Sequence, residues 1–322
     1  FRSKVKEALS LLKGAFSIII LTNKQMIVAR DRNGLRPLSL GKLGDAYIVA
    51  SETSAFDLIG AEYVRDVEPG ELLIISDNGI EEDRFAQKER RTMCAMEYVY
   101  FARPDSNIDG VNVHMARKRM GKELAKEWKA LGIEADVVTG VPDSSISAAI
   151  GFAEESQIPY ELGLIKNRYV GRTFIQPTQE LRERGVKMKL SPVVQVVKGK
   201  RVVMVDDSIV RGTTSRRIVR MLKEAGATEV HVVISSPPMK NPCYYGIDTS
   251  THEELIASSH NVEEIRAAIE ADTLTFLTAE GMIQATNRPF DEENGGLCMA
   301  CFTGKYPTEI FPDTVLPHEK DC

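Results

Sequence analysis

Residues 202–215 read VVMVDDSIVRGTTS, and the order of residue types in this segment is typical of a ligand-binding edge in an α/β sheet. Four apolar residues predict a buried strand. Asp206 and Asp207 follow it, and a loop containing Gly212 leads to a helix near Arg216. Ligands of open α/β sheets bind beyond the carboxyl ends of the strands, where free N–H groups and the helix dipole favour an anion. The two acids suit a neutral diol or a divalent metal, so the segment predicts a sugar-phosphate site. The alternative is a helix N-cap beside two solvated acids, which is the commoner role of an isolated Asp-Asp pair.

The flanking sequence predicts that this edge belongs to a parallel sheet. Strand patterns alternate with helix patterns, an order that favours right-handed crossovers between parallel strands. The expected strands are Asp136–Thr139, Tyr160–Ile165, Arg201–Val205 and Glu229–Ile234, and the expected helices are 113–131, Ser145–Glu155, Arg216–Ala225 and Val262–Ala271.

The first ninety or so residues predict a different, β-rich architecture. Short apolar runs separated by Gly, Asn and Asp are typical of a meander or layered sheet. The expected elements are a helix at Val5–Leu12 and strands at Phe16–Leu21, Met26–Ala29, Tyr47–Ala50 and Leu72–Ile75, followed by a charged linker or strand edge at Glu81–Arg91. We therefore expect two domains, residues 1–91 and 92–322.

Composition indicates a folded protein without a general affinity for nucleic acid. The 322 residues are 43% hydrophobic and 27% charged, and 41 basic against 46 acidic side chains give a net charge of −5. Such a balance provides no basic field for nucleic acid. The longest apolar stretch, in Gly14–Leu21, is too short to span a bilayer. Five cysteines are too few, and odd in number, for a disulfide scaffold. We expect a cytoplasmic protein.

Two segments upstream of the acid pair are further candidates for anion binding. Residues 139–145 read TGVPDSS between a strand and a helix, and residues 166–172 read KNRYVGR, with three cations around one Gly. Taken alone, the first is more often a plain turn whose Ser caps a helix, and the second a solvated loop.

The cysteines allow several interpretations. Cys298 and Cys301 form a CxxC pair, while Cys94 and Cys243 lie far away in the sequence. A CxxC pair occurs in redox, zinc and iron–sulfur sites. The loop is not of thioredoxin type, which disfavours redox catalysis. Four cysteines could hold zinc or a [4Fe–4S] cluster, and spacing alone does not decide between them.

The acid-pair segment resembles the signature of the type I phosphoribosyltransferases, which bind phosphoribosyl pyrophosphate (PRPP). The whole chain resembles one family among them, the glutamine PRPP amidotransferases. This wider resemblance is carried by RDRNGLRPL at 30–38, ASET at 50–53, CAMEYVYFARPDS at 94–106, QPTQ at 176–179, SSPP at 235–238 and CYYGID at 243–248. It implies a partial N-terminal-nucleophile (Ntn) hydrolase domain, β-rich and layered, followed by a type I phosphoribosyltransferase domain with a parallel sheet flanked by helices.

The resemblance also implies roles for individual residues. Asp206 and Asp207 would be catalytic, together with the cations of a lid, Lys166, Arg168 and Arg172. PRPP would be bound by Ser144, Asp206, Asp207, Ser208, Arg211, Gly212, Thr213, Thr214 and Ser215. One Mg²⁺ per subunit would be held by Ser144, Asp206 and Asp207. One [4Fe–4S] cluster per subunit would be held by Cys94, Cys243, Cys298 and Cys301, and Cys322 has no family role.

The implied activity is transfer of glutamine-derived ammonia to C1 of PRPP, giving 5-phosphoribosylamine, glutamate and pyrophosphate in the first committed step of purine synthesis. Purine nucleotides would be feedback inhibitors and the assembly a homo-oligomer, by resemblance a tetramer. The family's glutaminase begins with a catalytic Cys, whereas position 1 here is Phe and the nearest cysteine is Cys94. We therefore expect residues 1–91 to be only the later part of that domain, and the chain as written to use ammonia but not glutamine.

Two other functions compete with this one. A non-catalytic regulator that binds PRPP as a signal is disfavoured by the acidic charge balance. It is also disfavoured by the intact lid and by the intact pyrophosphate loop, which the resemblance places at residues 139–145. A phosphoribosyltransferase that uses a purine or pyrimidine base is disfavoured by the glutaminase-like residues before position 91.

Overall fold

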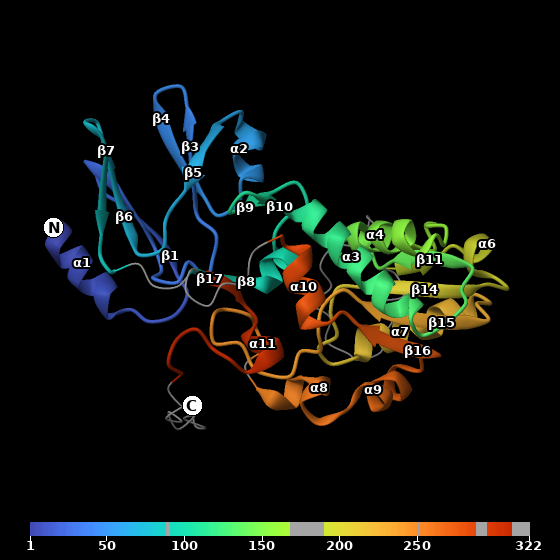
Figure 1. Cartoon of the computed structure of the whole chain (residues 1–322). Coiled ribbons are helices and arrows are strands. Elements are labelled where there is room, and N and C mark those ends of the chain that lie inside the picture. Colours follow the sequence, from blue (N-terminus) through green and yellow to red (C-terminus); the bar gives the residue numbers. More distant parts are fainter. Residues whose placement is uncertain (88–90, 168–189, 250, 288–294, 311–322) are drawn as a thin grey trace, which may run out of the picture.

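The computed structural model describes residues 1–87, 91–167, 190–249, 251–287 and 295–310. Two regions follow one another along the chain, a β-rich amino-terminal region and a larger region built on a parallel sheet (Figure 1). This arrangement confirms the expected two-domain α/β class. The boundary between residues 91 and 92 stays a prediction. No helix in the described ranges is long and apolar enough to cross a membrane.

The amino-terminal region consists of two small antiparallel sheets and two helices. The first sheet has the order β1-β2-β6-β7, with β1 at Ser17–Leu21, β2 at Gln25–Arg30, β6 at Glu71–Ser76 and β7 at Gly79–Arg84. The second has the order β4-β3-β5, with β3 at Ser39–Leu43, β4 at Ala46–Ala50 and β5 at Glu62–Asp66. Helix α1 is Arg2–Leu11 and helix α2 is Ser54–Ile59.

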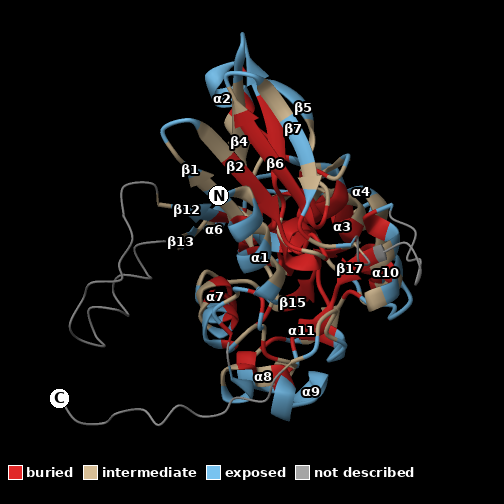
Figure 2. Ribbon diagram, turned by 90° about the vertical axis from the view of Figure 1, so that its left-hand side faces the viewer, coloured by how far each residue is buried: buried red, intermediate tan, exposed pale blue. Residues whose placement is uncertain are grey.

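Successive side chains of β2 alternate between two cores, and this alternation explains why these elements form layers. Ile27 packs under α1 with Val5 and Leu9, whereas the next residue, Val28, packs against Leu40 of the second sheet. Successive side chains of a strand point to opposite faces, so one strand supplies both cores. Figure 2 shows β2 and β6 as buried strands between more exposed neighbours.

All four strands expected in this region are present, within two residues at each end. Strands β3 and β5 and helix α2 were not predicted, because their sequences are short and contain exposed charged or polar positions. The charged stretch expected at Glu81–Arg91 forms the edge strand β7 as far as Arg84. It pairs on one side only, with β6.

The second region contains a four-stranded parallel sheet of order β11-β14-β15-β16. Its strands are β11 at Val137–Gly140, β14 at Arg201–Asp206, β15 at Glu229–Ile234 and β16 at Thr273–Phe276. Val203 and Val205 of β14 pack beneath one set of helices, α3 at Val113–Lys129, α4 at Ile146–Ser156 and α10 at Ala279–Ala285. Val202 and Met204 pack beneath the opposite set, α7 at Thr213–Glu224 and α9 at Val262–Ile269. The sheet is buried on both faces, as parallel sheets usually are.

Three differences from the sequence prediction concern this sheet. The segment expected as a strand at Tyr160–Ile165 is not a full member, because only Tyr160 forms a single bridge, to Val138. Leu164–Lys166 instead forms β12, which pairs antiparallel with β13 at Leu190–Pro192. Strand β16 was not predicted, because its short TLTF sequence is half polar. Helix α10, which packs on the sheet, was not predicted either.

Short elements complete the fold around the sheet. These are β8 at Arg91–Cys94, the π-helix η1 at Glu97–Phe101, the hairpin of β9 (Asn107–Ile108) and β10 (Val111–Asn112), α6 at Val194–Val197, the 3-10 helix η2 at His252–Glu254, α8 at Ile256–Ser259, β17 at Gly295–Cys298 and α11 at Ala300–Thr303. Strand β17 pairs in parallel with β8, which joins the end of the second region to its beginning.

A buried carboxylate connects the two regions. Asp109, in the turn between β9 and β10, lies 3.8 Å from the guanidinium of Arg30 and 3.2 Å from that of Arg91. Arg30 is fully buried and also donates to the carbonyl oxygens of Gly34, Arg36 and Val67. Removing one partner of a buried ion pair leaves the other charge uncompensated, so this contact favours one placement of the hairpin against the amino-terminal region.

Helices α3 and α4 cross at two glycines. A Cβ atom on Gly121 would lie 1.9 Å from the carbonyl oxygen of Ala148, and one on Gly151 would lie 1.9 Å from that of Lys118. These distances are far below van der Waals contact. The two helix backbones therefore touch, and only glycine at both positions permits the approach.

We predict that Gly151→Ala lowers the free energy of unfolding by at least about 3 kcal/mol, since the helices must separate and the core beneath them repack. Urea unfolding followed by circular dichroism measures the change. Lys126→Ala, at an exposed position of α3, is the control and should cost less than about 1 kcal/mol. Equal effects of the two substitutions would contradict the assigned role of the crossing.

Candidate active site

The acid pair lies at the carboxyl end of β14, and both carboxyl groups are buried. Asp206 accepts a hydrogen bond of 3.0 Å from the hydroxyl of Ser145 and one of 2.9 Å from the backbone N–H of Asp207. Asp207 accepts hydrogen bonds from the hydroxyls of Ser144 and Ser208, the latter at 2.7 Å. The two acids are thus held by residues from two adjacent strand-to-helix loops.

Burial dominates the electrostatics of this pair. It raises the pKa of Asp206, and the neighbouring charge of Asp207 raises it further. Burial also raises the pKa of Asp207, against the opposing effects of Ser144, Ser208 and Arg117. Two adjacent carboxylates in a dry site resist simultaneous ionisation. A bound cation, or hydroxyl donors from a ligand, would offset that cost.

Arg117 of α3 is the cation that acts on Asp207, and its side chain is almost fully buried. Its guanidinium donates to the carbonyl oxygens of Tyr98, at 2.6 Å, and Ala102, at 2.8 Å. Those carbonyls belong to η1 and the residue after it. Arg117 therefore joins the π-helix at the start of the second region to the acid pair.

The loop after the acids ends in an unobstructed helix N-terminus. Gly212 is the N-cap of α7, with a φ of +76°, and has no side chain to cap the helix. Thr213 and Thr214 are exposed in the first turn, Ser215 is buried, and the first turn contains no acidic residue. Free N–H groups and hydroxyl donors at such a site favour an anion. Helix α7 begins three residues before the expected start at Arg216.

The pyrophosphate-loop candidate lies beside the acids. Val141 donates its N–H to the carbonyl oxygen of Val205 at 2.9 Å, which places the loop next to the end of β14. Lys166, the first of the three lid cations expected from the sequence, forms an ion pair of 2.6 Å with Asp143 of this loop. The other two lid cations, Arg168 and Arg172, lie outside the described residues.

The four cysteines matched by the sequence come from three segments that the fold brings together. Cys94 and Cys298 are register partners in the parallel pair β8–β17. Cys301 lies one helical turn further on, and its carbonyl oxygen accepts hydrogen bonds from the N–H groups of Lys240 and Asn241, just before Cys243. The thiol of Cys301 is close enough to interact electrostatically with the other three. Cys322 lies outside the described residues.

Burial makes the thiols of Cys94, Cys298 and Cys301 poor anions in the absence of a metal. It raises the pKa of Cys94 to about 12, against the opposing effect of Arg36, and that of Cys298 to about 11. Burial also raises the pKa of Cys301 well above its usual value. A coordinating metal deprotonates a thiol outright, so a bound metal group would offset the cost of burying these three thiols.

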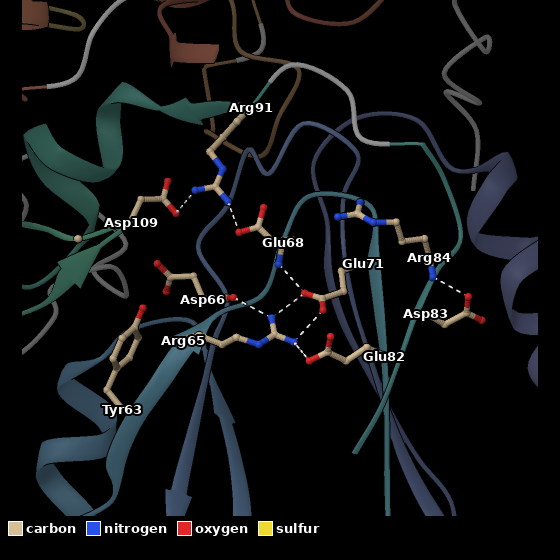
Figure 3. Close-up of a pocket in the computed structure, with 11 residues that line it drawn as sticks. Tyr63, Arg65, Asp66, Glu68, Glu71, Glu82, Asp83, Arg84, Arg91 and Asp109 are labelled. Atoms are coloured by element: carbon tan, nitrogen blue, oxygen red, sulfur yellow. Dashed lines mark hydrogen bonds and ion pairs between the residues drawn. The ribbon is translucent and has the colours of Figure 1, made fainter. Parts of the chain in front are cut away.

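Two clefts lie in the described part of the structure, one away from these sites and one next to the phosphate loop. One, of about 800 Å³, lies between the amino-terminal sheets and the β9–β10 turn, and Figure 3 shows the ion pairs along its wall. Arg65 pairs with Glu71 and Glu82, and Arg91 pairs with Glu68. The other, of about 930 Å³, runs along α7 from Thr213 to Ala225, with β13 as its opposite wall. The second cleft therefore opens beside the candidate phosphate loop.

Comparison with known proteins agrees with this geometry. A phosphoribosyl transferase domain model matches residues 108–250, and a glutamine amidotransferase domain model matches residues 1–58. The amidophosphoribosyltransferase of Bacillus subtilis is 69% identical over 321 residues, which is 100% of this chain and 67% of that protein. The amidophosphoribosyltransferase of Archaeoglobus fulgidus is 52% identical over 299 residues, covering 93% of this chain and 64% of that protein.

The chain belongs to the amidophosphoribosyltransferase family. The solved structure of the B. subtilis glutamine PRPP amidotransferase complexed with ADP and GMP has a TM-score of 0.91 to it at 69% identity, over 98% of this chain and 69% of that one. The resemblance expected from the sequence is thereby confirmed. The chain spans about two thirds of the length of these amidophosphoribosyltransferases.

The sequence analysis gave no role to two residues of the candidate site, Ser145 and Arg117. Ser145 adjoins Ser144, and only the structure distinguishes which hydroxyl reaches which acid. The sequence does contain a pattern that could have identified Arg117. It occupies the apolar stripe of α3 with Val113, Met120 and Leu124, a position where a cation needs buried partners.

We predict that Arg117→Met lowers the free energy of unfolding by about 3 kcal/mol, since two buried carbonyl groups lose charged donors. The adjacent substitution Lys118→Met is the control. It removes only an ion pair with Glu154 in which both side chains are partly exposed, and should cost less than about 1 kcal/mol. Urea unfolding of both variants tests the difference, and equal losses would refute the buried role of Arg117.

Proposed function

We propose that the chain transfers ammonia to C1 of PRPP, forming 5-phosphoribosylamine and releasing pyrophosphate. The observation that carries the proposal is the buried acid pair, held by serines of the pyrophosphate loop and followed by an open helix N-terminus. In the reaction the lone pair of ammonia forms the C1–N bond, the C1–O bond to pyrophosphate breaks, and the nitrogen loses a proton.

The acid pair is assigned to the ribose. Asp206 and Asp207 accept hydrogen bonds from the two ribose hydroxyls, and their negative charge stabilises positive charge that develops on the ring as the leaving group departs. The ligand hydroxyls also offset the cost of burying two carboxylates. Mg²⁺ would be held by Ser144, Asp206 and Asp207 together with substrate oxygens, and when bound it would neutralise charge on the pyrophosphate.

The loop and the helix after it are assigned to the 5-phosphate. Gly212 brings the backbone close to the ligand, while Thr213, Thr214 and Ser215 offer hydroxyl and N–H donors. Ser208 adds a hydroxyl to this set. Arg211 was also expected in it from the sequence, but its guanidinium bonds to Glu254 in the structure. We assign stabilisation of the leaving pyrophosphate to Lys166, Arg168 and Arg172. Lys166 is already paired with a carboxylate of the pyrophosphate loop, an anion that pyrophosphate could replace.

The cysteines are assigned to a [4Fe–4S] cluster with a structural role, because they tie β8 to the carboxyl-terminal elements. A zinc site needs four sulfur atoms about 2.3 Å from a single ion. Four cysteines are also the usual ligands of a [4Fe–4S] cluster, and the family resemblance carried by the segments around Cys94 and Cys243 favours the cluster over zinc.

The remaining assignments concern the whole protein. We propose for it glutamine as the ammonia source, a homotetramer and inhibition by purine nucleotides, on the resemblance to the family. The B. subtilis relative has been solved with ADP and GMP. We propose that purine nucleotides also bind the present protein.

The test of the activity is PRPP-dependent pyrophosphate release with Mg²⁺, with ammonia and glutamine compared as donors. We expect release with ammonia. Release with glutamine would mean that the polypeptide assayed carries a working glutaminase. The double variant Asp206→Asn with Asp207→Asn should lose at least about a hundredfold in kcat/KM, the order seen when electrostatic stabilisation of a transition state is removed.

The control for that variant is Asp77→Asn, at an exposed turn between β6 and β7, which should retain full activity. Circular dichroism and urea unfolding establish that the double variant folds. Near-normal turnover by a folded double variant would overturn the assignment. Tight PRPP binding by the unsubstituted protein without release from either donor would favour the regulator.

The test of the cluster is metal analysis of anaerobically purified protein. We expect about four irons per chain and broad visible absorption. Cys298→Ser should abolish both, because it removes one of four ligands. Stoichiometric zinc without iron would refute the cluster.

A further inference from the structure

The phosphate loop, residues 208–212, connects the acid pair to α7. A short segment that belongs to neither the acid pair nor its two loops packs against it. This supporting segment comprises η2 and the start of α8, residues 252–256. The N–H of Ile256 donates to the carbonyl oxygen of Val210 at 2.8 Å. The side chain of Ile256 also faces Gly212, where an added Cβ would lie 3.2 Å from its terminal methyl carbon. Backbone and side chain of one residue thus contact two positions of the loop.

An ion pair adds a third contact. The guanidinium of Arg211 bonds to the carboxylate of Glu254 in η2. The sequence assigned Arg211 to PRPP, as one of the loop residues. In the structure its charged end is engaged by the supporting segment, and 62% of its side chain is exposed. The partner, Glu254, is 29% exposed.

We infer that Arg211 is an anchor of the phosphate loop rather than a PRPP ligand, and that Glu254 is a positioning residue that acts through it. This inference rests on the proposed function, because it concerns how that site is kept in shape. Ile209 of the loop is buried in the core and Ile269 packs beside Gly212, but Gly212 itself has no side chain and adopts a left-handed φ of +76°. A glycine turn of this kind benefits from a partner next to it that holds its N–H groups toward a phosphate.

Loss of the anchor is expected to have a moderate effect, confined to the KM for PRPP. Exposed ion pairs contribute little to overall stability, so the melting temperature should hardly change. Small displacements of a binding group are nevertheless costly for a positioned substrate. Loss of the anchor should therefore raise KM for PRPP by about threefold to tenfold and leave kcat within about twofold.

The experiment compares four variants with the full protein in the ammonia-dependent assay. They are Arg211→Gln, Glu254→Gln, the two combined, and the charge exchange Arg211→Glu with Glu254→Arg. If Arg211 is an anchor, the two single substitutions should raise KM for PRPP equally, and combining them should raise it no further. The charge exchange should return KM to within about twofold of normal. Glu253→Gln, at the neighbouring exposed position of η2, is the matched control and should change nothing.

Two results would overturn the inference. The first is a loss in Arg211→Gln more than tenfold larger than in Glu254→Gln, with no recovery in the exchange, which would identify Arg211 as a direct PRPP ligand. The second is normal KM in all four variants.

Amide hydrogen–deuterium exchange separates the anchor from the proposed function. In the protein without substrate, Glu254→Gln should speed exchange across residues 208–212, and Glu253→Gln should not. An inactive unsubstituted protein would reject the proposed function, while this exchange difference would still decide whether the anchor exists. Unchanged exchange in Glu254→Gln would reject the anchor.

Discussion

The backbone contact between α3 and α4, made possible by Gly121 and Gly151, sets the position of the groups around the acid pair. Because each glycine faces the backbone of the other helix, α3 and α4 lie closer together than any larger side chain would allow. The start of α4 brings Ser144 and Ser145 to the acids, and α3 carries Arg117 toward them. If the helices were further apart, the serines and the arginine could not converge on the same two carboxylates. The close packing of α3 on α4 in the core thus fixes the distances between the serines, the arginine and the two acids at the carboxyl edge of the sheet.

The acid pair shows how a binding site can be costly for the free protein. Burial raises the pKa of both carboxyl groups, and the serine hydroxyls and Arg117 only partly offset the cost. A ligand that offers hydroxyl donors and a cation together removes most of that cost when it binds. The same reasoning applies to the buried thiols around Cys94, which a metal group would stabilise. In both places, binding relieves a free-energy cost that folding imposed.

Much of the fold was predictable because its signals are local. Strand β15 occupies the expected residues and β14 ends one residue later than expected, because both are rich in β-branched apolar residues. Strand β16 was missed because half of its residues are polar, and β12 was assigned to the wrong sheet because pairing depends on distant residues. The acids and Ser144 were visible in adjacent motifs. Arg117 and Glu254 were not assigned, because their partners lie in other segments. No spacing rule revealed that β8 and β17 would pair.

The pairing of β8 with β17 also constrains the order in which the chain assembles during synthesis. Cys94 leaves the ribosome roughly 200 residues before Cys301, which at about 5–20 residues per second is a delay of roughly 10–40 s. Throughout that interval β8 lacks its parallel partner, and the amino-terminal region has no contact with the carboxyl-terminal elements. The parallel sheet can form first, since its strands and helices lie between these two cysteines. Closure of the cysteine site is then a late event, and a nascent chain stalled before residue 295 would leave Cys94 without Cys298 and Cys301.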